Sequence, residues 1–183
     1  MELQPGTELG SMFSQLVERN FHRTLAFYDP DVLMYLGDLL TEFIRSENLY
    51  KIRDAGDRPL EDVGEMLIES HPLLNAPCFH RERQVRKHIG DFTLFFTGMF
   101  PESICNWRMR QQRLDSFVDY VKAGKESYHI VAAFNQFEYR KVAPLFRRLS
   151  DKFETCVYGL NLVRSHLDLG QPRLTGQIRE LLT

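Results

Sequence analysis

One apolar run in the middle of the chain constrains the fold more than any other feature. Between Ile89 and Phe100 the only charged residue is Asp91, and Pro101 follows the run. The residues from Phe79 up to the run are rich in charge. We predict one helix over about Phe79 to Met99, because the residue before a proline disfavours helical backbone. A helix that is apolar on all sides is buried on all sides, so its second half should lie at the centre of the fold.

Apolar residues at intervals of three and four predict further helices on both sides of this segment. They are expected over about Glu8–Arg23, Pro30–Ile44, from Pro59 to before His71, Gln111–Lys122, Ser127–Phe134 and from Pro144 to before Gly170. Gly124 is well placed as a C-terminal cap after Lys122. No run alternates as a strand would. We predict an all-α fold, a compact single-domain bundle of six or seven helices over residues 1–183. Residues 1–7 should form a flexible N-terminus and residues 171–183 a short tail helix.

Composition and charge narrow the class of protein. The net charge of −2 argues against a nucleic-acid-binding protein, which usually carries a basic excess. The first residues lack the basic and apolar segments of a signal peptide, and the longest apolar run is shorter than the roughly 20 residues of a membrane span. Three cysteines far apart, Cys78, Cys105 and Cys156, are typical of free thiols in a reducing compartment. We therefore expect a soluble, cytoplasmic protein.

Three segments resemble a protein family. They are residues 90–102 (GDFTLFFTGMFPE), residues 120–128 (YVKAGKESY) and residues 145–150 (LFRRLS). Together they resemble a family of uncharacterised bacterial all-helical proteins, over about residues 80 to 167. That family has no assigned activity, so the resemblance implies a bacterial source and a helical fold and carries no function to this chain.

Motifs for catalysis and metal binding are incomplete. Glu126 and His129 have the spacing used in di-metal helical bundles, but such sites need two of these motifs and two further glutamates. No nucleophile elbow and no glycine-rich phosphate loop is present. The basic stripe at residues 81–87 is interrupted by Glu82, and we interpret it as a solvated face. We expect no metal and no cofactor, and favour a protein that is not an enzyme.

Asp91 is the residue that departs most clearly from its surroundings. A carboxylate inside an apolar helix must be paired, hydrogen-bonded or protonated. The polar residues after Gly124, namely Lys125, Ser127 and Tyr128, are the partners we expect, and Lys87 one turn earlier is the alternative. Functional sites and structural ion pairs perturb a buried carboxylate alike, so burial alone does not separate the two roles. We favour a structural role for Asp91 over a functional one.

Two classes of function remain open. The first is a non-catalytic interaction or regulatory protein that acts on a protein partner through a helix face, or as a homodimer. The alternative is a small-ligand-binding protein or enzyme with an aromatic pocket, in which Asp91, Trp107, Lys125, Ser127 and Tyr128 would bind the ligand. A wholly filled core would favour the first class. A cleft of a few hundred cubic ångströms with Asp91 on its wall would favour the second. We expect neither nucleic acid nor a membrane as partner.

Overall fold

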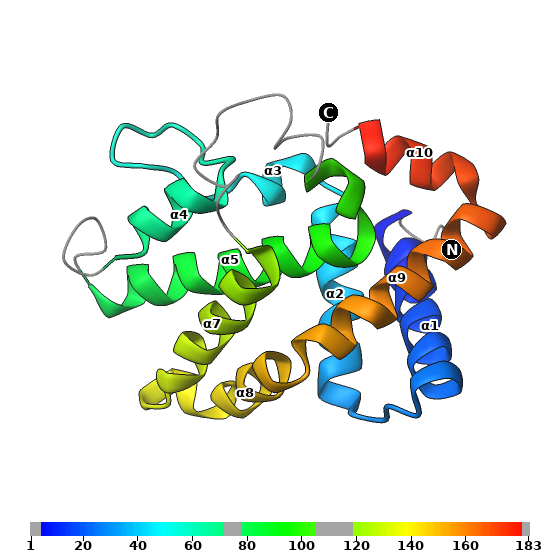
Figure 1. The fold of residues 1–183 in the computed structure, drawn as a ribbon, viewed down its shortest axis with the longest axis horizontal. Coiled ribbons are helices and arrows are strands. Elements are labelled where there is room, and N and C mark those ends of the chain that lie inside the picture. The colour runs from blue at the N-terminus through cyan, green and yellow to red at the C-terminus, as the bar shows by residue number, and fades with distance from the viewer. Residues whose placement is uncertain (1–4, 72–77, 105–118, 181–183) are drawn as a thin grey trace.

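The chain folds into helices packed around one central helix (Figure 1). The structure, a computed structural model, describes residues 5–71, 78–104 and 119–180. Within these ranges no strand occurs, and an isolated antiparallel bridge joins Arg53 to Pro59. The all-α prediction is therefore confirmed. The helices are α1 (Pro5–Leu25), α2 (Pro30–Phe43), α3 (Ser46–Leu49), α4 (Val63–Glu69), α5 (Phe79–Met99), α7 (Tyr120–Ala133), the 3-10 helix η2 (Phe137–Lys141), α8 (Ala143–Asp151), α9 (Phe153–Gly170) and α10 (Pro172–Glu180).

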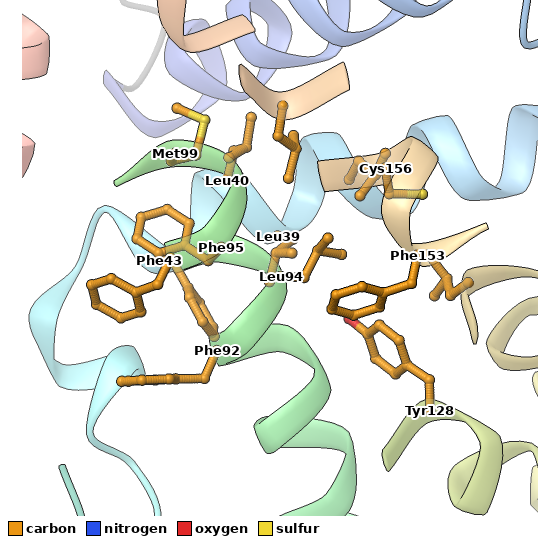
Figure 2. Close-up of a cluster of buried hydrophobic side chains, with 14 of the residues drawn as sticks. Leu39, Leu40, Phe43, Phe92, Leu94, Phe95, Met99, Tyr128, Phe153 and Cys156 are labelled. Atoms are coloured by element: carbon orange, nitrogen blue, oxygen red, sulfur yellow. The ribbon is translucent and has the colours of Figure 1, made fainter. Parts of the chain in front are cut away.

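Helix α5 crosses the middle of the molecule and contacts α2, α4, α7 and α9. Every residue from His88 to Phe96 is buried, which confirms the prediction of a central buried helix. Aromatic rings pack on both sides of it (Figure 2). On one side Phe95 meets Phe43 of α2, with 5.4 Å between ring centroids. On the other, Tyr128 of α7 meets Phe153 of α9 at 5.9 Å.

The start of α2 follows directly from the local sequence. Asp29 caps the helix, because its carboxylate accepts a hydrogen bond from the Val32 backbone N–H at 3.2 Å. Pro30 occupies the first turn, where its missing N–H costs nothing. Arg148 of α8 then pairs with both Asp29, at 2.7 Å, and Asp31, at 2.6 Å. These two ion pairs join α8 to the start of α2.

The predicted number of six or seven helices is wrong, since the described residues alone form ten. Two of the additional elements, α3 and η2, are too short to show a periodic apolar pattern. The long helix predicted from Pro144 is divided at Lys152 into α8 and α9. The chain turns there because α8 packs mainly on α7, whereas α9 packs on α5 and α1.

Gly124 is not a helix cap, which corrects a second expectation. It lies inside α7, a single helix that joins the end of the predicted Gln111–Lys122 segment to the Ser127–Phe134 segment. Residues 111–118 lie outside the described ranges. A Cβ atom at Gly124 would lie 2.2 Å from Thr93 Oγ1 and 2.4 Å from the Phe153 ring. The glycine therefore permits α7 to approach α5 and α9 closely.

Helix α9 packs against both α1 and α5. Phe21 of α1 rests on Gly159, where a Cβ atom would lie 2.1 Å from the ring. Leu160 rests in the same way on Gly98 of α5, with 2.6 Å to the Cβ atom that glycine lacks. None of the described helices combines the length and the apolar character needed to cross a membrane.

Candidate functional site

Asp91 is buried, with 1% of its surface exposed, and its carboxylate accepts three hydrogen bonds. The Tyr35 hydroxyl donates to Oδ1 at 2.5 Å, and the Tyr128 hydroxyl donates to the same oxygen at 2.7 Å. The Lys87 ammonium donates to Oδ2 at 2.6 Å. The charge and both oxygens of Asp91 therefore have partners, as a buried carboxylate requires.

Three helices bring these groups together. Lys87 lies one turn before Asp91 on α5, whereas Tyr35 comes from α2 and Tyr128 from α7. The two tyrosine rings meet edge to face, with centroids 6.5 Å apart. Gly90 permits the Tyr128 ring to lie against α5, because a Cβ atom at this position would lie 2.4 Å from the ring. The cluster joins α2 and α7 to the central helix through one carboxylate.

The protonation states in this cluster follow from its contacts. Burial raises the pKa of the Asp91 carboxyl, but the Lys87 charge and the three hydrogen bonds lower it by more, so the pKa lies below its usual value. Burial, and then the negative charge of Asp91, raise the pKa of Tyr35 and of Tyr128 well above the usual value. At neutral pH the group is an ionised carboxylate held by two protonated tyrosines, with no proton poised for transfer.

The structure brings only part of the predicted set together. Tyr128 contacts Asp91, and so does Lys87, which was the alternative partner. Lys125 instead pairs with Glu154 at 2.8 Å. Ser127 is buried, and its hydroxyl has no hydrogen-bond partner in the described part of the chain. Trp107 lies outside the described residues.

A cavity of about 300 Å³ lies beside this cluster, with Asp91 on its wall. Most of its lining comes from one face of α5, with Lys51 before the helix and Tyr139 of η2 opposite. The lining residues are Lys51, His80, Arg83, Gln84, Lys87, His88, Asp91 and Tyr139. Three of the eight side chains are lysine or arginine and one is an aspartate, so the wall of the cavity is basic.

Two of these cations are neutralised within the protein. Lys87 pairs with Asp91, and Lys51 pairs with Glu42 at 2.7 Å. Arg83 makes no ion pair within the part of the chain that the structure describes, and its Nε is buried without a hydrogen-bond acceptor. Its guanidinium lies 4.1 Å from the Tyr139 ring centroid and 5.6 Å from that of Phe146. Burial lowers the pKa of Arg83, but guanidinium pKa values start so high that the group stays charged.

His88 also lines this cavity. It is 1% exposed, and its Nε2 lies 2.9 Å from the Leu49 carbonyl oxygen, so Nε2 carries the proton of the neutral ring. Burial lowers the pKa of His88 to about 4, which keeps the ring neutral at pH 7. Its Nδ1 is also buried and has no hydrogen-bond partner among the described residues.

Two contacts at this site, those of Tyr35 and Arg83, could not be predicted from the sequence. Tyr35 lies 56 residues from Asp91, and no local pattern connects the two. Arg83 belongs to the basic stripe that we interpreted as solvated, yet its guanidinium lies over the Tyr139 ring and near that of Phe146. That interpretation is wrong for Arg83 because η2 folds back over this part of α5. The stacking could not be inferred from residue types on α5 alone.

Metal-ligand geometry is absent from the described residues, where no three His, Cys, Asp or Glu side chains form a group that could hold an ion. In the single Glu-x-x-His motif, His129 Nδ1 accepts a hydrogen bond from Arg147 at 2.9 Å. Glu126 lies 4.0 Å from Lys122. Both side chains of the motif thus face cations of the protein itself.

No protein-family model, curated protein or solved structure matches this chain. The resemblance to bacterial all-helical proteins therefore stays a prediction.

Proposed function

We propose that this protein binds a small anionic molecule in the cavity beside Asp91 and performs no chemistry on it. The observation that carries the proposal is Arg83, a guanidinium without an ion-pair partner in the described chain, on the wall of a cavity of about 300 Å³. A partly buried cation is costly unless it is paired, so an external anion that meets Arg83 gains more there than at a solvated arginine.

The remaining lining supports an anion rather than a cation or a neutral molecule. The carboxylate of Asp91 does not repel the anion strongly, because Lys87 and two tyrosines already compensate its charge. Lys51 also lines the wall, but it is already paired with Glu42, so the attraction for an anion comes from Arg83.

Binding without catalysis fits the same contacts. A general base needs a pKa near the working pH. The pKa of Asp91 lies below its usual value, and burial lowers that of His88 to about 4. The other hypothesis is an interaction or regulatory protein that works through a helix face or as a homodimer. In the described residues we find no feature that identifies a partner for it as Arg83 identifies an anion.

Thermal unfolding in inorganic phosphate tests the proposal. The melting temperature should rise with phosphate concentration at constant ionic strength, because a ligand that binds only the folded state stabilises it. Arg83→Met removes the charge but keeps an apolar stem to pack on Tyr139, and we expect it to abolish the phosphate-specific rise. The matched control is Arg173→Gln, which alters an exposed arginine on α10.

The control also separates binding from the general stabilising effect of phosphate, which acts on any folded surface. An equal rise in the protein, in Arg83→Met and in Arg173→Gln would overturn the proposal. Circular dichroism on each variant establishes that the helices are intact before the comparison is made.

A further inference from the structure

A second, larger cavity of about 520 Å³ lies next to the basic one. It is formed by the start of α5, the end of α7 and η2, and its lining is dominated by apolar side chains: Phe79, Ile130, Ala133, Phe134, Phe137 and Tyr139. Two of these are unusually exposed, Phe79 at 76% and Phe137 at 87%. Large apolar side chains that surround a cavity at the surface are typical of a binding site.

The backbone at Phe137 is strained to hold this position. Its φ of 51° lies in the left-handed region, which a bulky side chain rarely occupies. Strain of this kind persists where the surrounding structure over-determines it, and such residues cluster at ligand-binding sites. Here the strained residue is the first of η2, and its ring lines the apolar cavity instead of joining the core.

The two cavities adjoin at Tyr139 and along the first turns of α5. Tyr139 lines both of them, and on α5 their lining residues alternate, with Phe79 and Glu82 on the apolar side and His80 and Arg83 on the basic side. These four residues fall within about one and a half turns of the helix. The Arg83 guanidinium, stacked on Tyr139, therefore lies at the boundary between the apolar and the basic cavity.

We infer that the two cavities bind one molecule, an anionic amphiphile whose carboxylate or phosphate meets Arg83 and whose apolar chain lies between Phe79, Phe134 and Phe137. This inference rests on the proposed function and adds the class of ligand to it. Glu82 fixes the orientation of the ligand. Its carboxylate repels the anionic group of the ligand from the apolar cavity, whereas Arg83 attracts that group to the basic cavity. The apolar chain excludes water from the phenylalanine rings, which is the gain expected from burying apolar surface.

Chain length gives the sharpest test. Each buried methylene group should tighten binding about fourfold. Octanoate, titrated calorimetrically below the concentration at which it forms micelles, should therefore bind at least tenfold more tightly than butyrate. Arg83→Met should weaken octanoate until it binds no better than 1-octanol, which has the chain without the charge.

Variants of the exposed rings test the other end of the molecule. Phe79→Ser and Phe137→Ser should each reduce octanoate affinity severalfold towards that of butyrate, and leave the phosphate effect on the melting temperature unchanged. The matched control is Leu169→Ser, which removes an 86% exposed apolar side chain from the end of α9 and should change neither. Both phenylalanines are exposed, so their replacement leaves the core intact.

The outcomes separate this inference from the proposed function. If octanoate binds no more tightly than butyrate while the Arg83-dependent phosphate effect persists, the amphiphile inference fails and anion binding stands. If octanoate binding depends on chain length but not on Arg83, the two cavities do not share a ligand and the inference fails as well. Loss of the phosphate effect itself would remove the proposed function.

Discussion

Replacement of Asp91 by alanine should destabilise the fold more than any other single change at a charged residue of α5. The substitution removes the acceptor of three hydrogen bonds and leaves the Tyr128 hydroxyl, whose residue is fully buried, with no partner. A buried hydroxyl without a partner costs about 1–3 kcal/mol. Tyr35 and Lys87 are less buried and regain some hydration, so their loss is smaller.

The lost hydrogen bonds lower the free energy of unfolding, and removal of the cost of burying a charge offsets part of that loss. The net decrease should be about 2–4 kcal/mol. For a chain of this size that corresponds to a fall in melting temperature of roughly 4–16 °C. The stabilising contribution of Asp91 should also depend on pH. Because the pKa of Asp91 is lowered in the folded state, its contribution is present above about pH 4 and is lost as the pH falls through the folded-state pKa.

Chemical denaturation at pH 7 and at pH 3 measures both effects. Asp38→Ala is the control, since Asp38 is an exposed carboxylate on α2 and its loss should stay within about 0.5 kcal/mol. Combining Asp91→Ala with Lys87→Ala should recover part of the loss, as contacting residues couple. An Asp91→Ala protein as stable as Asp38→Ala at pH 7 would refute the assignment of Asp91 as the charged anchor of three helices.

Three further expectations follow from buried groups elsewhere. Gly124→Ala should lower the free energy of unfolding by about 1–3 kcal/mol through overpacking, whereas Gly176→Ala, with open space around it, should be neutral or stabilising in the same denaturation assay. Burial raises the pKa of Cys156 to about 12, so iodoacetamide at pH 8 should modify exposed Cys78 and spare Cys156 until the chain unfolds. Mass spectrometry of the peptides measures the modification of both cysteines, and equal modification would contradict this prediction. Burial lowers the pKa of His88 to about 4, so between about pH 6.5 and pH 4 the imidazole binds a proton in the unfolded chain but not in the folded one. The free energy of unfolding should therefore fall by roughly 3 kcal/mol over that range. His88→Gln should show a flatter pH profile there, and identical slopes would count against the buried neutral ring.

The elements that could be predicted from sequence are those whose signal is local. The apolar run after Ile89 is apolar on every helical face, so burial of α5 followed from the sequence without knowledge of its neighbours. The cap at Asp29 is similar, because a side chain, a proline and the first N–H groups of one helix suffice to specify it. The need of Asp91 for a donor was likewise predictable from burial alone.

What could not be predicted depends on contacts between distant segments. Tyr35 contributes a hydroxyl to Asp91, but nothing within α2 distinguishes it from a tyrosine that packs on the surface. From the local sequence Gly124 is expected at a helix end, and only its close contacts with Thr93 of α5 and Phe153 of α9 explain its presence inside α7. Arg83 is unremarkable in a charged stretch until η2 covers it.

The position of α9 also bears on the order in which the chain can fold during synthesis. The ribosome releases α1, α2 and α5 well before α9, and at about 5–20 residues per second the interval between Phe21 and its seat at Gly159 is on the order of ten seconds. Throughout that time the face of α1 that α9 will cover lacks this partner, and the corresponding face of α5 lacks it from the synthesis of α5 onward. The nascent chain therefore passes through a long aggregation-prone stage, in which a holding chaperone has an obvious surface to protect.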